Sequence, residues 1–173
     1  MGIDPGAVTS GYGIVDEEGH RIFYVDAGAI NTTSKLSFPE RLKKIYDGLE
    51  LVISQRRPDA VVLESLFFAK NAQSALKLGH ARGVAVLAAV KLGVPVFEYT
   101  PLEIKQSVVG YGLAEKGQVQ QMVKTLLKLE VVPKPHDASD ALAAAICHIH
   151  SSRMREAAKG AGIRPGTGVK RQK

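Results

Sequence analysis

Three strand-like runs precede any helix in this sequence, and that order is the strongest constraint on its fold. The very short run MGID is followed by β-rich runs at about 12–16 and 21–30, and EEGH between these two reads as a hairpin turn. Beyond the loop NTTSKLS, helical and strand-like segments alternate. This order predicts an α/β fold with a five-stranded mixed sheet, whose first three strands are antiparallel, flanked by helices on both faces.

The later segments are assigned from their apolar spacing. FPERLKKIYDGLELVISQRR has helical spacing and ends before Pro58, and DAVVLES reads as a short buried strand. A long helix follows Asn71, and VPVFEYTP supplies the fifth strand. Three further helices are expected in LEIKQSVVG, QVQQMVKTLLKL and DASDALAAAICHIH.

Length and composition favour one domain. The chain has 173 residues, of which 45% are hydrophobic, enough for one sizeable core. We expect this domain to cover residues 1–151 and the Gly-, Pro- and basic-rich residues 152–173 to form a flexible tail. No secretory or membrane-spanning pattern appears, so the protein is expected to be soluble and intracellular. Cys147 is the only cysteine, which excludes an intrachain disulfide and a multi-thiolate zinc site.

The charge balance favours a polyanionic partner. The net charge is +6, and part of the excess lies in the predicted tail. A solvated tail without a partner accounts for that part of the charge equally well.

The long helix after Asn71 is apolar nearly all round in its second half, so more than one of its faces must be covered. Its small residues would allow another helix to approach closely. A homodimer contact and burial within the same domain both account for them. These small residues are Ala81, Gly83, Ala85, Ala88 and Ala89.

Four acidic residues stand where chain segments end or begin. Asp4 ends the first strand and Glu64 ends the strand AVVLE, while Asp137 and Asp140 share one face at the start of the last helix. Either aspartate alone could be a helix cap that complements the helix dipole. Four converging carboxylates would instead repel one another unless cations were bound, and hard oxygen ligands suit Mg²⁺ or Mn²⁺. Two such ions would form the site of a phosphodiester-cleaving nuclease.

The chain resembles the RuvC family of Holliday junction resolvases, within the ribonuclease H-like superfamily. The resemblance runs through GIDPG, GYG, LESLFFAKNAQSALKLGHARGVAVLAAV, VPVFEYTPLEIKQSVVGYGLAEKGQVQQMV and HDASDALAAAICHIH, and does not cover the tail from about 152. It implies that two Mg²⁺ ions, which Mn²⁺ can replace, are bound by Asp4, Glu64, Asp137 and Asp140. It also implies a bacterial, cytoplasmic homodimer that resolves four-way DNA junctions by paired symmetric nicks in homologous recombination and DNA repair, with the branch-migration proteins RuvA and RuvB as partners.

Two departures from the family pattern stand out. The start MGIDPG is shorter than the usual first strand of the family. His136 precedes Asp137, whereas some members carry a histidine in place of that acid. Because Asp137 is present, we expect His136 to flank the ligands.

The resemblance also suggests DNA contacts. It favours Phe67 as a wedge that stacks on a base unpaired at the junction, which leaves Phe68 for core packing. Lys105 and Lys116 resemble catalytic lysines near the scissile phosphate. Further backbone contacts are expected from the basic residues on or beside the long helix, although solvated surface positions explain each equally well. These residues are Lys70, Lys77 and Arg82.

Three other classes of protein share part of this sequence pattern. GIDPG also resembles the phosphate loop of actin-like ATPases and sugar kinases, but 173 residues leave no room for their second lobe. A nuclease acting on ribosomal RNA precursors would share the carboxylates, but FFAKNAQSALKLG argues for a junction enzyme. A binding module that positions other proteins at junctions would bind without metal-dependent cutting.

Overall fold

Five strands form one mixed sheet in the order β3-β2-β1-β4-β5 in the computed structural model, which describes residues 1–65 and 72–160. Strand β1 pairs antiparallel with β2 and parallel with β4; β2 and β3 form the predicted hairpin, and β4 is parallel to β5. The predicted α/β fold is therefore confirmed. The strands are β1 Gly2–Asp4, β2 Thr9–Glu18, β3 Arg21–Asn31, β4 Val61–Glu64 and β5 Val96–Tyr99.

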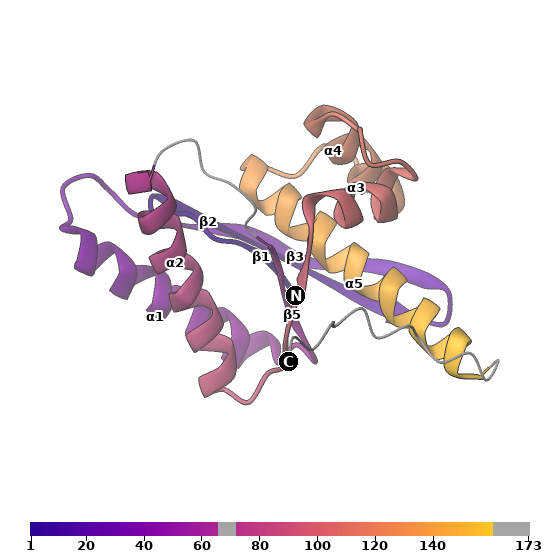
Figure 1. Ribbon diagram of the computed structural model, residues 1–173, viewed down its shortest axis with the longest axis horizontal. Helices are drawn as coiled ribbons and strands as arrows, with labels where there is room; N and C mark the ends of the chain where they lie inside the picture. Colours follow the sequence, from indigo (N-terminus) through magenta and orange to yellow (C-terminus); the bar gives the residue numbers. More distant parts are fainter. Residues whose placement is uncertain (66–71, 161–173) are drawn as a thin grey trace, which may run out of the picture.

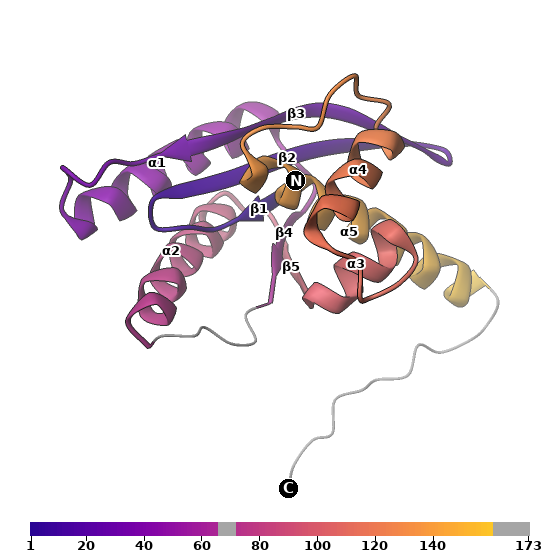
Figure 2. The same cartoon turned by 90° about the horizontal axis from the view of Figure 1, so that it is seen from above.

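Helices cover both faces of the sheet (Figures 1 and 2). Two of them, α1 (Phe38–Arg56) and α2 (Ala72–Lys91), pack over one face around a core that includes Ile45, Leu49 and Ile53. The helices α3 (Pro101–Val109), α4 (Lys116–Leu126) and α5 (His136–Gly160) cover the other. None of the described helices combines the length and the apolar character needed to cross a membrane.

Local sequence explains where two of these helices begin. Ser37 and Glu40 form a capping box at the start of α1, and Thr100 and Glu103 form another at the start of α3. In both helices a proline follows the cap, where its missing N–H costs no hydrogen bond. The second capping box begins α3 directly after the end of β5, which places Lys105 close to the end of the sheet.

The small residues of α2 fall into two groups. Ala81, Ala85, Ala88 and Ala89 are fully buried within this chain, so intrachain packing accounts for them. Gly83 is exposed. The large exposed apolar side chains of α2 are Leu76, Leu87 and Val90, which succeed one another at helical spacing. The part of the chain that the structure describes therefore leaves an apolar stripe of α2 exposed, and this stripe consists of other residues than the buried alanines.

Glycines allow α5 to lie directly against the sheet. A Cβ atom added at Gly2 would stand 1.9 Å from the carbonyl oxygen of Ala141, and one added at Gly11 would stand 2.2 Å from that of Asp137. Such distances are far inside van der Waals contact, so no larger residue fits without displacing the helix. These two glycines therefore serve the close approach of a helix.

Helix α5 continues to Gly160, beyond the predicted domain boundary at 151. Its last turns are held against the sheet because Arg153 pairs with Glu17 of β2, and Arg155 donates a 2.7 Å hydrogen bond to the hydroxyl of Tyr99. Residues 152–160 are thus helical, and 161–173 lie outside the described residues. The division into a domain and a tail stays a prediction for that last part.

Candidate active site

Asp4 and Glu64 lie at the same edge of the sheet. Strands β1 and β4 are parallel neighbours, with Ile3 opposite Leu63, and each acid is the last residue of its strand. The carboxyl ends of parallel strands point the same way, so the register brings the two acids to neighbouring positions. The two acids therefore end neighbouring strands of the sheet.

Asp137 and Asp140 come to this edge from the start of α5. The backbone of β2 at Gly11 touches the backbone of Asp137, and Gly11 is the strand partner of Asp4. The contact therefore fixes the start of α5 beside the end of β1. Both aspartates are partly buried, whereas Ala138 and Ser139 between them are buried in the core.

The electrostatics show that the four acids share one environment. Burial, followed by repulsion from Asp140, Asp137 and Glu64 in that order, raises the pKa of Asp4 to about 7. Burial and the charge of Asp140 also raise the pKa of Glu64 above its usual value. An acid whose pKa is raised by other acids indicates a place where a bound cation would relieve repulsion.

Two lysines lie beside the acids in one cavity. Its volume is about 340 Å³, and it is lined by Glu64, Lys105, Lys116 and Asp140, with apolar walls from α3, α4 and α5. The Nζ atom of Lys116 is 2.5 Å from Oδ2 of Asp140, and this hydrogen bond raises the pKa of Lys116. Lys105 contributes a positive charge that lowers the pKa of Glu64. The structure therefore brings both predicted lysines to the acids.

A second contact holds α4 against the start of α5. Nε2 of Gln120 is 3.0 Å from Nδ1 of His136, and Gln120 is buried on α4, one turn after Lys116. His136 lies one turn before Asp140. The pairs Lys116–Asp140 and Gln120–His136 therefore join α4 and α5, which run antiparallel here, at successive turns. Sequence reasoning missed Gln120, although its i, i+4 spacing from Lys116 was visible.

The donor atoms suit a hard cation, because the acids offer only carboxylate oxygens. In the described ranges 1–65 and 72–160, no three His, Cys, Asp or Glu side chains already converge as a ligand cluster. One oxygen of Asp140 contacts Lys116 instead. The residues thus fit a metal by chemistry and by shared electrostatics.

The remaining predicted DNA contacts are more scattered. Phe67 and Lys70 lie outside the described residues. Lys77 is exposed on α2 and does not line the cavity beside the acids. Arg82 is largely withdrawn from solvent, with only 14% of its side chain exposed.

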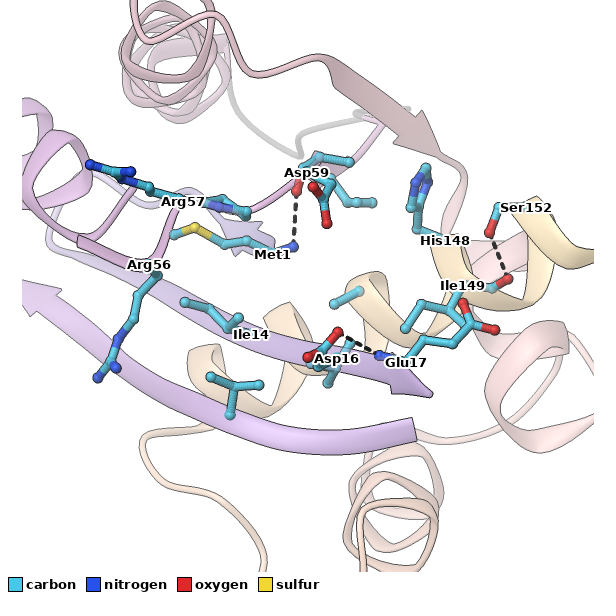
Figure 3. A pocket seen from close by; sticks show the side chains of 16 residues that line it. Met1, Ile14, Asp16, Glu17, Arg56, Arg57, Asp59, His148, Ile149 and Ser152 are labelled. Carbon is cyan, nitrogen blue, oxygen red and sulfur yellow. Dashed lines mark hydrogen bonds between the residues drawn. The ribbon is translucent and has the colours of Figure 1, made fainter. Parts of the chain in front are cut away.

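Another cavity, of about 350 Å³, lies at the opposite end of the parallel strands (Figure 3). Its walls include Met1 at the start of β1, Asp59 before β4 and His148 in the middle of α5. None of the four predicted acids lines it. This cavity is therefore separate from the predicted site, where β1 and β4 finish.

This sheet order, with acids at the ends of β1 and β4 and at the start of α5, defines a nuclease with a ribonuclease H-like fold. The family model for the crossover junction endodeoxyribonuclease RuvC matches residues 1–148. The chain therefore belongs to the RuvC family, the nucleases that resolve Holliday junctions in DNA recombination and repair.

Named relatives support this assignment. A crossover junction endodeoxyribonuclease RuvC of Geobacter sp. (strain M21) is 58% identical over 160 residues, which cover 92% of this chain and 97% of that protein. The corresponding protein of Ruminiclostridium cellulolyticum is 57% identical over 154 residues, which cover 89% of this chain and 93% of that protein. The structure of Thermus thermophilus RuvC in complex with a Holliday junction substrate matches with a TM-score of 0.84 and 36% identity, over 88% of this chain and 93% of that one.

Proposed function

We propose that this chain is a Mg²⁺-dependent resolvase that cuts four-way DNA junctions by paired symmetric nicks. The observation that supports this proposal most is that burial and the acids of β4 and α5 together raise the pKa of Asp4 on β1, beside a cavity lined by two lysines. Such a site suits hydrolysis of a phosphodiester without a covalent enzyme intermediate, leaving 5′-phosphate and 3′-hydroxyl ends.

The four acids are the proposed metal ligands, namely Asp4, Glu64, Asp137 and Asp140. When bound, two Mg²⁺ ions, or Mn²⁺ in their place, would activate the attacking water and stabilise the departing 3′ oxygen. The raised pKa of Asp4 supports this role, since a cation would offset the repulsion that the other three acids impose.

The two lysines are proposed to act on the scissile phosphate. Lys105 and Lys116 line the same cavity as Glu64 and Asp140, so their ammonium groups lie within reach of an anion bound there. Positive charge at that position would stabilise the charge that develops on the phosphate oxygens. Lys116 would exchange its contact with Asp140 for one with the phosphate.

DNA binding outside the cavity is assigned to other residues. Lys77, exposed on α2, is proposed to contact a backbone phosphate, and Lys70 is assigned the same role. Phe67 is proposed to stack on a base opened at the junction. Phosphate contacts of this kind would make binding strongly dependent on salt.

A homodimer is proposed for the intact enzyme, because two symmetric cuts need two sites related by a twofold axis. The uncovered apolar stripe on α2 supports this assembly. Leu76, Leu87 and Val90 are 65%, 56% and 59% exposed, which is costly for side chains left in water. We also propose that the enzyme acts in the bacterial cytoplasm with the branch-migration proteins RuvA and RuvB as partners.

The test is cleavage of a synthetic four-way junction beside a linear duplex of the same sequence, with Mg²⁺ and with a chelator. We expect paired nicks in the junction only, dependent on the metal and lost in Asp4→Asn. Junction affinity measured in chelator should be kept in that variant, because the phosphate contacts are elsewhere. Tight junction binding without any cutting by the wild type would instead favour a binding module.

A further inference from the structure

We infer that Arg82 is a positioning residue that holds Glu64 in place by supplying a hydrogen bond that Pro5 cannot make. This role differs from the phosphate contact expected from the sequence. The inference rests on the proposed function, because it takes Glu64 as a ligand of the site.

The hydrogen-bond ladder between β1 and β4 ends at a proline. The N–H of Val62 donates to the carbonyl of Met1, and Gly2 is the partner of Val62. In a parallel ladder this pattern repeats every two residues, so the carbonyl of Glu64 would accept from the nitrogen of residue 5. Residue 5 is proline and has no N–H. The carbonyl of a proposed ligand therefore needs another donor.

Arg82 of α2 is that donor. Its Nη1 atom donates to the carbonyl oxygen of Glu64, and its Nη2 atom is 2.7 Å from a carboxylate oxygen of Glu98 on β5. Glu98 is the strand partner of Leu63, the residue before Glu64. One guanidinium thus joins the end of β4, the neighbouring strand β5 and helix α2.

The surroundings of Arg82 favour a fixed structural task. Only 14% of its side chain is exposed, and both Nη atoms already have partners within the protein. A phosphate contact would have to replace the buried bond to Glu64, whereas the exposed Lys77 on the same helix has no such constraint. A guanidinium can bridge the two acceptors because its donors are held in a rigid plane, which a lysine ammonium cannot reproduce.

The experiment compares Arg82→Gln and Arg82→Lys with the wild-type full chain. Single-turnover cleavage of a four-way junction at saturating enzyme reports the catalytic step, and the dissociation constant in chelator reports DNA binding. We expect cleavage by Arg82→Gln to fall about 10- to 100-fold, as for a misplaced catalytic group, while the dissociation constant stays within about twofold. Arg82→Lys should lose less than Arg82→Gln, because it keeps the positive charge beside Glu98.

Two further variants give the contrast. Lys91→Gln also removes a basic residue of α2 that pairs with a surface glutamate, Glu50, and it should leave cleavage and binding unchanged. Lys77→Gln should weaken junction binding. It should also reduce the slope of the logarithm of the binding constant against the logarithm of salt concentration by about one, which corresponds to one released counterion fewer. If Arg82→Gln behaves like Lys77→Gln, with weaker binding and normal cleavage at saturation, the positioning role is wrong.

Amide hydrogen exchange tests the same role without any cleavage. Ser65 directly follows Glu64, and its N–H donates a 2.7 Å hydrogen bond to the carbonyl oxygen of Tyr99. The amide of Ser65 should exchange faster in Arg82→Gln than in the wild type, whereas its exchange should be unchanged in Lys91→Gln. Circular dichroism checks that both variants are folded. Unchanged exchange at Ser65 would overturn the inference. A wild type that binds but does not cut would overturn the proposed function alone, since the exchange result still decides the role of Arg82.

Discussion

Lys116 and Asp140 are joined by a 2.5 Å contact between Nζ and Oδ2, which ties the first residue of α4 to an acid near the start of α5. The lysine thus supplies positive charge where the proposed site binds a metal. It also lowers the pKa of Asp4, which the neighbouring acids raise. The ammonium group therefore partly offsets the acid repulsion in the protein without metal.

Replacement of either lysine should affect cutting more than binding. For Lys116→Ala and Lys105→Ala, we expect single-turnover cleavage at saturating enzyme to fall about 10- to 100-fold, because each ammonium would stabilise charge on the scissile phosphate. The dissociation constant for the junction should change by less than about threefold. Lys44→Ala on α1, an exposed lysine, is the matched control. Cleavage rates equal to wild type in both variants would remove these lysines from the mechanism.

The stability of the metal-free protein should fall with rising pH because of Asp4. Its folded-state pKa of about 7 lies above the ordinary value of 3.8, so the folded protein binds the proton more tightly than the unfolded chain. The stabilising effect of this protonation is present below pH 4 and is lost as the pH rises to about 7, a change on the order of 4 kcal/mol. In chelator, the unfolding free energy of Asp4→Asn, measured with denaturant, should therefore rise relative to that of the wild type as the pH increases from 4 to about 7.

Added Mg²⁺ should reverse that order at pH 8. The ionised acids of the wild type would bind the metal in the folded state, which raises its melting temperature by linkage. Asp4→Asn lacks one ligand charge, so its melting temperature should respond less. A larger Mg²⁺ response in Asp4→Asn than in wild type would contradict the assignment of Asp4 as a ligand.

Gly11→Ala should damage both the fold and the site. The added Cβ would stand 2.2 Å from the carbonyl oxygen of Asp137, so α5 must move away from β2. We expect a loss of about 1–3 kcal/mol in unfolding free energy, as for other overpacked positions, together with a large loss of cleavage. Gly19→Asn is the control, because a Cβ at Gly19 meets nothing within 4 Å and asparagine tolerates its positive φ of 60°. Equal unfolding curves for Gly11→Ala and wild type would contradict this packing argument.

An aspartate in the apolar stripe of α2 should give monomers. Leu87 is 56% exposed at the middle of the stripe, and Leu87→Asp would place a charge in the proposed dimer contact. Sedimentation should show a dimer for the wild type and a monomer for Leu87→Asp, with paired nicking lost. Val131→Asp, at a side chain that is 72% exposed outside α2, should remain dimeric. A Leu87→Asp variant that stays dimeric would place the contact elsewhere.

Strand ends were the part of the site that the sequence could predict. Asp4 and Glu64 each close an apolar run, so their place at the sheet edge follows from the pattern and from parallel pairing. The rung between Gln120 and His136 depends on how two helices cross, which no local spacing determines. The bond from Arg82 to Glu64 similarly depends on how α2 lies against the sheet, although Pro5 was a visible sign that a donor was missing.

The end of α5 was harder to predict for another reason. Residues 152–160 carry little apolar pattern, so composition suggested a tail, whereas Met154, Arg155, Glu156 and Ala157 all have good intrinsic helix propensity. Tertiary contacts decide the outcome. Arg153 reaches Glu17 at the far end of β2, and such a long-range pair is invisible in a local window of sequence.

Helix α5 contacts all five strands and both α3 and α4, and among the described helices it is the last in chain order. Two of the four acids, Asp137 and Asp140, belong to α5. During synthesis on the ribosome, the sheet and helices α1 to α4 therefore emerge before the site can be completed. A growing chain therefore holds Asp4 and Glu64 without their counterparts until α5 docks against β2. Nuclease activity would then begin only after α5 has docked and brought Asp137 and Asp140 to the other two acids.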